Sequence, residues 1–370
     1  MRFPLTAILL AFAGLSLSAT APAAAQAPAT PSGVEDCLPG GACAHPLPVR
    51  VVIVTLFEIG ADTGDKPAEF QLWKERRKLD VHIPFPQGYH DLYYEPATQT
   101  LAMVTGVGNI RSATAVMALG LDQRFDLSKA YWLVAGIAGI DPKDASIGSA
   151  AWAAYLIDGD LAHEIDPREI PKDWKYGYFA RHTRGPNDKT PPDASGGEMF
   201  ALNMGLRDWA YELTKDVKLP DDPSVAATRA KFKGFPNAQK PPFVLKGDQL
   251  AALTFWHGAM LNDWANDWVH YWTEGKGEFV TSAMEETGIA TALGYLDKIK
   301  RADKDRFMVL RAGSNYTMPP PGVAAAPHLL AENEGYAGMT VALESLYLVG
   351  SKVVDEITLN WDKYEKAPPK

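Results

Sequence analysis

The stretch 281–315 contains the residues whose types are best suited to ligand binding and chemistry. Glu285 and Glu286 follow Met284 at the expected start of a helix, because apolar residues at helical spacing come next. A short apolar run at 307–310 predicts a buried strand, and it is followed by three polar residues, Arg311, Ser314 and Asn315. Carboxylates at a helix start and polar groups at a strand end fit a pocket at the carboxyl edge of a parallel sheet.

Another acidic residue ends the first predicted strand. Residues 51–57 form a continuous apolar run with several β-branched side chains, which is typical of a buried parallel strand. Glu58 follows directly. A carboxylate in this position is either an active-site residue or an ordinary loop charge, and the sequence leaves both interpretations open.

Glycines follow the next two predicted strands. A strand at 101–105 ends in Thr105, and Gly106 and Gly108 follow it before a helix through 115–121. This order presents backbone N–H groups to an anion, although a tight strand-to-helix turn without a ligand has the same composition. Gly136 follows the strand at 131–135, where the missing Cβ lets a ligand approach the backbone closely.

These residues require a scaffold of alternating strands and helices. Apolar runs at 51–57, 101–105, 131–135, 151–157 and 307–310 alternate with helical patterns, which predicts a three-layer α/β/α fold with a central mixed sheet. Residues 166–242 are polar and rich in proline, and we interpret them as an elaboration with one helix at 198–214. A closing helix is predicted at 334–349.

Composition excludes several classes of protein. The chain has 370 residues, is 46% hydrophobic and carries a formal net charge of -9, which gives no support for a nucleic-acid partner. The histidines show no ligand spacing, so we expect no metal and no cofactor. Three tryptophans at 262–272 favour packing, since most tryptophans serve cores or interfaces.

The amino terminus has the features of a secretory signal. Arg2 precedes an apolar stretch at 5–17, and small residues follow at 23–27. We predict a cleaved signal at 1–26, a flexible arm at 27–48 and a periplasmic or secreted protein without a membrane span. An uncleaved anchor is the alternative. Cys37 and Cys43 either form a small disulfide loop or remain two free thiols.

Four motifs in this order resemble the nucleoside phosphorylase superfamily and, within it, the purine nucleoside permease family. They are the strand ending in Glu58, the turn Thr105-Gly106-Val107-Gly108, Met284-Glu285, and Arg311-Ala312-Gly313-Ser314-Asn315. The resemblance implies a nucleoside phosphorylase-like domain over 49–361 and a purine nucleoside as the ligand. Members of the superfamily cleave the N-glycosidic bond with phosphate or with water.

The resemblance also implies roles for single residues. The turn with Thr105, Gly106 and Gly108 faces phosphate or water, Met284 and Glu285 hold the ribose, and Gly136 lies under the base or sugar. Phe255 or Trp256 stacks on the base. Ser314 and Asn315 face the purine and, with Glu58, form the expected catalytic set. Arg311 and Arg111 are candidates for gripping phosphate, which is the one expected co-substrate. Asn315 stands where many members have an aspartate.

Two functions of different classes remain open at this point. The favoured one is an exported purine nucleoside phosphorylase or hydrolase. The other is a non-catalytic nucleoside-binding protein that supports transport. The sequence does not fix the oligomeric state, and a homo-oligomer is one option. A serine hydrolase is disfavoured because the chain has no GxSxG elbow.

Overall fold

A mixed sheet forms the centre of the computed structural model, which describes residues 45–370 except 187, 189–193 and 333. The sheet has 12 strands in the described part of the chain. β2 (Val51–Thr55) and β5 (Thr100–Val104) pair in parallel, and every residue of both is buried. Continuous apolar runs predict this burial, so the predicted α/β fold with a central mixed sheet is confirmed.

β7 (Tyr131–Ile140) is the strand around which the others are arranged. It pairs in parallel with β2 on one side and with β16 (Phe307–Tyr316) on the other. Its last two residues also pair antiparallel with β15 (Phe279–Ala283). β2 ends beside the middle of β7, at Val134, while β15 and β16 reach its carboxyl-terminal end.

The outer strands extend the sheet from these partners. Beyond β5 lie β4 (Leu92–Glu95) and β3 (Val81–Ile83). Beyond β15 lie β14 (Asp248–Ala251), β9 (Tyr155–Asp158) and β12 (Met199–Ala201). β16 also pairs with β8 (Ala150–Ala153), which pairs with β13 (Val244–Lys246).

The single strand predicted at 151–157 is divided into β8 and β9. The N–H groups of Ala154 and Tyr155 donate to Asp248 Oδ1 at 2.9 and 2.8 Å. Hydrogen bonds to the Asp248 carboxylate thus replace strand-to-strand hydrogen bonds at this point. β8, before the break, pairs with β16, and β9, after it, pairs with β14. A purely apolar run contains no signal for such a break.

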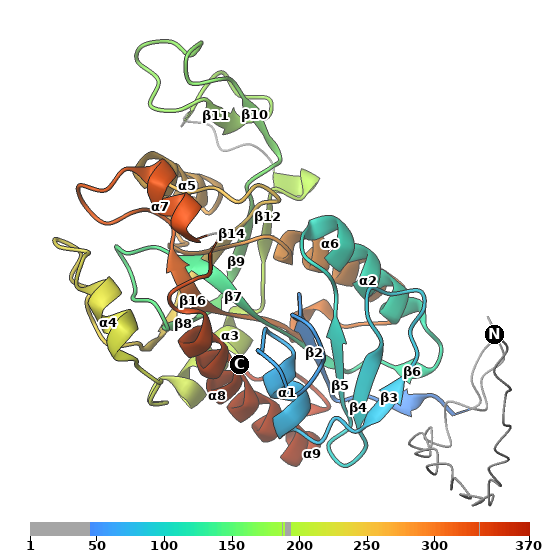
Figure 1. Cartoon of the computed structure of the whole chain (residues 1–370). Helices are drawn as coiled ribbons and strands as arrows, with labels where there is room; N and C mark the ends of the chain where they lie inside the picture. Colours follow the sequence, from blue (N-terminus) through green and yellow to red (C-terminus); the bar gives the residue numbers. More distant parts are fainter. Residues whose placement is uncertain (1–44, 187, 189–193, 333) are drawn as a thin grey trace, which may run out of the picture.

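Helices cover both faces of the sheet (Figure 1). α2 (Asn109–Leu121) and α6 (Glu286–Lys298) pack together on one face and share an apolar core with the sheet. α8 (Met339–Leu359), α1 (Gln71–Arg76) and α3 (Met204–Thr214) enclose a second apolar core on the other. The predicted closing helix was placed too early, because buried Val353 and Ile357 continue the apolar face of α8 beyond residue 349.

The region 166–242 contains more structure than the one predicted helix. β11 (Tyr178–Ala180) pairs with β10 (Ala162–Glu164) in a hairpin that projects from the body in Figure 1. The predicted helix at 198–214 begins only at Met204, where Asn203 caps it, and β12 occupies the preceding residues. A further helix, α4 (Pro223–Arg229), follows.

Three further α-helices, α5, α7 and α9, belong to the described chain. α5 (Ala259–Trp272) places its tryptophans in an aromatic cluster, so their predicted packing role is confirmed. α7 (Ala325–Glu332) lies beside α5 in Figure 1, and α9 (Trp361–Tyr364) follows α8.

The amino-terminal predictions fall largely outside the described residues. The predicted signal and both cysteines, Cys37 and Cys43, precede residue 45. The end of the predicted arm belongs to the folded body, because β1 (Leu47–Pro48) pairs with β6 (Phe125–Asp126). Within residues 45–370, leaving aside the gaps stated above, no helix combines the length and the apolar character needed to cross a bilayer.

Candidate functional site

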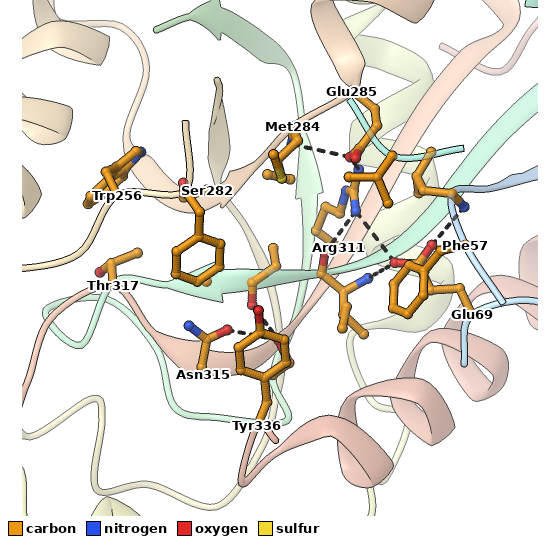
Figure 2. A pocket seen from close by; sticks show the side chains of 18 of the residues that line it. Phe57, Glu69, Trp256, Ser282, Met284, Glu285, Arg311, Asn315, Thr317 and Tyr336 are labelled. Atoms are coloured by element: carbon orange, nitrogen blue, oxygen red, sulfur yellow. Dashed lines mark hydrogen bonds and ion pairs between the residues drawn. The ribbon is translucent and has the colours of Figure 1, made fainter. Parts of the chain in front are cut away.

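A cavity of about 270 Å³ opens where β2, β7, β15 and β16 end. This is close to the lower end of the range of roughly 300–1,000 Å³ that is common for small-molecule sites. The residues predicted for the site that line it are Phe255, Trp256, Met284, Glu285, Arg311, Ser314 and Asn315. Trp256, Met284, Glu285, Arg311 and Asn315 are labelled in Figure 2. The predicted carboxyl edge of the sheet is therefore where the structure has its pocket.

Arg311 lies in the floor of the pocket with three carboxylates around it. Its Nη2 donates to Glu285 Oε2 at 2.7 Å, its Nε donates to Glu286, and its Nη1 lies 3.8 Å from Glu69 Oε1. Nη1 also donates to the carbonyl oxygen of Ile137 at 2.7 Å. The guanidinium is almost completely buried, and the surrounding carboxylates raise its pKa further despite the opposing effect of burial.

Glu285 is held at the pocket wall by groups from three elements. Its Oε1 accepts from the Gly108 N–H at 3.0 Å, and its Oε2 accepts from the Met284 N–H at 3.2 Å as well as from Arg311. A carboxylate offers about four lone-pair sites, so Oε1 retains one for a ligand. Gly288 lets the starts of α2 and α6 meet here, since a Cβ would lie 2.4 Å from the Asn109 carbonyl oxygen.

Glu69 is a pocket carboxylate that the sequence analysis missed. Its two oxygens accept from the N–H groups of Leu56 and Ile137, both at 2.7 Å. Complete burial, aided by the nearby Glu285 charge, raises the pKa of Glu69 to about 8, although Arg311 opposes the change. A carboxyl group with such a pKa can hold or release a proton near neutral pH.

Glu58, predicted as catalytic, does not line the pocket. Its Oε1 accepts from the Ala68 N–H at 2.6 Å, and its Oε2 accepts from the N–H groups of Phe70 and Gln71 at 2.9 and 2.6 Å. These are the donors at the start of α1, where a carboxylate is favourable. Glu58 thus fixes the segment that carries Glu69 and lies outside the residues that line the pocket, so its expected catalytic role stays a prediction.

The glycine-rich turn supports the site rather than lining it. Thr105 is buried and donates to the neighbouring Gly106 carbonyl oxygen, and Gly108 binds Glu285. Only Val107 of this turn lines the pocket. Gly136 lies against the charged cluster, because a Cβ would lie 2.3 Å from Arg311 Nη1 and 2.8 Å from Glu69 Oε1.

A β-bulge shapes the opposite end of the pocket. Gly313 pairs with Ala138 and Asn315 pairs with Gly139, so Ser314 is the additional residue on β16. Bulges change the direction of side chains, and here both Ser314 and Asn315 line the cavity. Ser314 Oγ donates to Asn315 Oδ1 at 2.9 Å, which leaves the Asn315 amide nitrogen as a donor.

Aromatic rings form the outer wall. Phe255 is 44% exposed and stacks on Tyr336, with ring centroids 6.2 Å apart and an interplanar angle of 9°. Trp256 is nearly buried and packs against Trp264 and Phe279. Both predicted aromatic residues line the cavity, but only Phe255 has a partner ring from the segment that follows α7.

A polar cluster lies next to Asn315, outside the lining residues. Asn315 Nδ2 is 3.5 Å from Glu332 Oε2, and Glu332 lies near His257 and His328. Burial raises the pKa of Glu332 to about 7 and lowers that of His257 to about 4. Chain order gives no sign of this cluster, because its two histidines are distant in sequence.

The chain has an α/β fold of the nucleoside phosphorylase and nucleosidase type. Futalosine hydrolase of Helicobacter pylori has a TM-score of 0.50 at 14% identity, covering 83% of this chain and 98% of that one. A Helicobacter pylori MTAN variant with 5′-methylthioadenosine in its active site gives 0.50 at 14%, covering 83% and 99%. These likenesses establish the fold.

The chain belongs to the purine nucleoside permease family. The family model described as purine nucleoside permease (NUP) matches residues 48–369. A purine nucleoside permease of Candida albicans is 31% identical over 325 residues, which cover 87% of this chain and 78% of the relative. The family resemblance carried by the sequence motifs is thereby confirmed.

Proposed function

We propose that the protein binds a purine nucleoside in this pocket and cleaves its N-glycosidic bond with water. The observation that carries the proposal is the buried arrangement of Glu69, Arg311 and Glu285 at one end of a cavity that has amide and aromatic groups at the other. The ribose would lie against Glu285 and the base between Asn315 and the aromatic wall.

Cleavage of this bond develops positive charge on the ribose and negative charge on the departing base. Preorganised groups that oppose both charges accelerate such a reaction. The Glu285 carboxylate, with its free lone pair on Oε1, suits the ribose hydroxyls. The Asn315 amide nitrogen suits N7 or O6 of the base as a hydrogen-bond donor.

Glu69 is the candidate base for the attacking water. With a pKa near 8, it is ionised in a useful fraction of molecules at neutral pH and can take a proton from water as the C1′–O bond forms. The proton then resides on Glu69, and the base departs with the electron pair of the glycosidic bond. Cleavage should therefore become faster as the pH rises toward 8.

Water suits this pocket better than phosphate does. Arg311 is the one cation among the described lining residues, and it already contacts Glu69, Glu285 and Glu286. A phosphate dianion would meet carboxylates without a free positive charge, which is unfavourable in a buried site. Arg111, the other candidate, is exposed and donates to the Val107 carbonyl oxygen.

The second candidate function is nucleoside binding without chemistry, in support of transport. The family name and one observation favour it: an amide at Asn315 cannot protonate the leaving base as a carboxylic acid could. In either function we propose that the protein acts outside the cytoplasm, on the basis of the amino-terminal sequence pattern.

One experiment separates the two functions. The purified chain is mixed with inosine or guanosine, with and without phosphate, and free base is measured by chromatography beside nucleoside affinity by calorimetry. Free base released equally with and without phosphate supports the hydrolase. Tight binding with no free base supports the binding protein, and release that depends on phosphate contradicts the choice of water. Glu69→Gln serves as the inactive control.

A further inference from the structure

His257, His328 and Glu332 bring three metal-ligating side chains together beside the pocket. One ligand atom from each lies within 4.8 Å of the others. His257 precedes α5, while His328 and Glu332 stand at i and i+4 on α7. Residues with this spacing lie on the same face of a helix, so α7 presents two ligands to the third.

The distances in this cluster fit a shared cation better than direct hydrogen bonds. His257 Nδ1 lies 3.8 Å from Glu332 Oε2, and His328 Nδ1 lies 3.9 Å from Glu332 Oε1. Both are too long for a hydrogen bond. Two atoms that each bind Zn²⁺ at about 2.1 Å can be separated by up to about 4.2 Å. Small side-chain rotations would therefore suffice to bring the ligand atoms around one cation.

A hydrogen bond between the two rings accounts for only part of the arrangement. His328 Nδ1 and His257 Nε2 are 3.1 Å apart. His257 Nδ1 is nevertheless buried without a hydrogen-bond partner in the described part of the chain. The side chain of His257 is 0% exposed, and a buried polar atom of this kind is expected to have a partner.

α7 needs an attachment that its apolar residues do not provide. None of the residues of Ala325–Glu332 is buried, and Leu330 is 65% exposed. Its polar side-chain contacts are those of His328 with His257 and of Glu332 with Asn315. The chain from α7 then leads to Tyr336, whose ring stacks on Phe255 in the pocket wall.

We propose that His257, His328 and Glu332 bind one divalent transition-metal cation of the Zn²⁺ type, which fastens α7 beside the purine end of the pocket. Two imidazoles and one carboxylate form a donor set that suits Zn²⁺ and leaves one position for water. Mg²⁺ is a poor match, since it prefers oxygen ligands in octahedral geometry. The role proposed for the metal is to attach α7 to the segment that contains His257.

The metal would also couple the segment to the ligand, a consequence that rests on the proposed function. Trp256, which lines the pocket, is the neighbour of His257, and Glu332 contacts the amide of Asn315. A cation that fixes Glu332 therefore fixes the environment of the residue assigned to the base.

The test is calorimetric titration of Zn²⁺ into the full chain without an affinity tag, after removal of metal with a chelator. We expect one equivalent to bind, with at least tenfold weaker affinity in His328→Ala and in Glu332→Gln. His270→Ala is the matched control, because His270 is exposed on α5 and contacts Glu278. Its Zn²⁺ affinity should equal that of the wild type, and circular dichroism verifies that each variant folds.

Hydrogen exchange supplies a second measurement at the same site. Zn²⁺ should slow exchange at residues 325–332 in the wild type but not in His328→Ala. The proposal is overturned if Zn²⁺ fails to saturate one site, or if His328→Ala binds it as tightly as the wild type. Neither result depends on nucleoside cleavage: a chain that binds Zn²⁺ but releases no base contradicts only the proposed function.

Discussion

Replacement of Glu69 by glutamine should change how the stability of the protein depends on pH. The pKa of Glu69 is raised from 4.5 to about 8 in the folded state. Between these values the folded chain holds a proton that the unfolded chain has lost. The contribution of Glu69 to the free energy of unfolding is therefore greatest below about pH 4.5, and it decreases as the pH rises toward 8.

The magnitude follows from the size of the pKa change. At about 1.36 kcal/mol per pH unit, the change corresponds to on the order of 5 kcal/mol, and relaxation of the interior reduces it to about 2–4 kcal/mol. Glu69→Gln removes this dependence. It also turns an amide N–H₂ toward the donors of Leu56 or Ile137, which should cost about 1–3 kcal/mol at low pH.

Urea unfolding between pH 5 and pH 9 measures both effects. The variant should be less stable than the wild type at pH 5, and the difference should shrink or reverse by pH 9. Glu212→Gln is the control, since Glu212 is an exposed carboxylate paired with Lys215. Wild-type and Glu69→Gln curves that run parallel over this range would refute the assignment of the raised pKa to Glu69.

Three further changes test other parts of the site. Glu285→Gln should weaken inosine binding or turnover by roughly tenfold, through the loss of about 1–3 kcal/mol of charge-assisted hydrogen bonding; unchanged affinity and rate would remove Glu285 from the site. Asn315→Asp should shift the preference from inosine toward adenosine, because a carboxylate accepts from the 6-amino group, and equal rate ratios in both proteins would contradict a role in reading the base. Gly288→Ala should destabilise the fold by about 1–3 kcal/mol in urea unfolding, since its Cβ would meet the Asn109 backbone; Gly294→Ala, where a Cβ has open space, is its control.

The sequence predicts best those parts of the fold that depend on continuous burial. β2, β5 and β7 lie where apolar runs predict strands. β16 extends six residues further than its apolar run, to Tyr316, because its polar residues after Leu310 are buried against the pocket. A hydropathy pattern cannot distinguish such residues from the start of a loop.

The candidate site was predictable where a motif joins residues that are adjacent in sequence. Met284, Glu285, Ser314 and Asn315 all reach the pocket as the motifs imply. Glu69 was missed because the segment 58–70 is polar and has no periodic pattern. The apolar residues on both sides of it, Ala68 and Phe70, are buried. An acidic residue between two apolar residues was the one feature of the sequence that could have indicated a buried carboxylate here.

The pairing of β7 has a consequence for how the chain folds during synthesis. Phe307 pairs with Trp132, and Tyr316 pairs with Ile140, so the central strand lacks one full edge until residues 307–316 have been made. Such long-range pairing slows folding, because distant segments must meet before the sheet gains stability. The β7–β16 edge therefore forms only after most of the chain has been made, whereas β2, β5 and β7 can pair before that point.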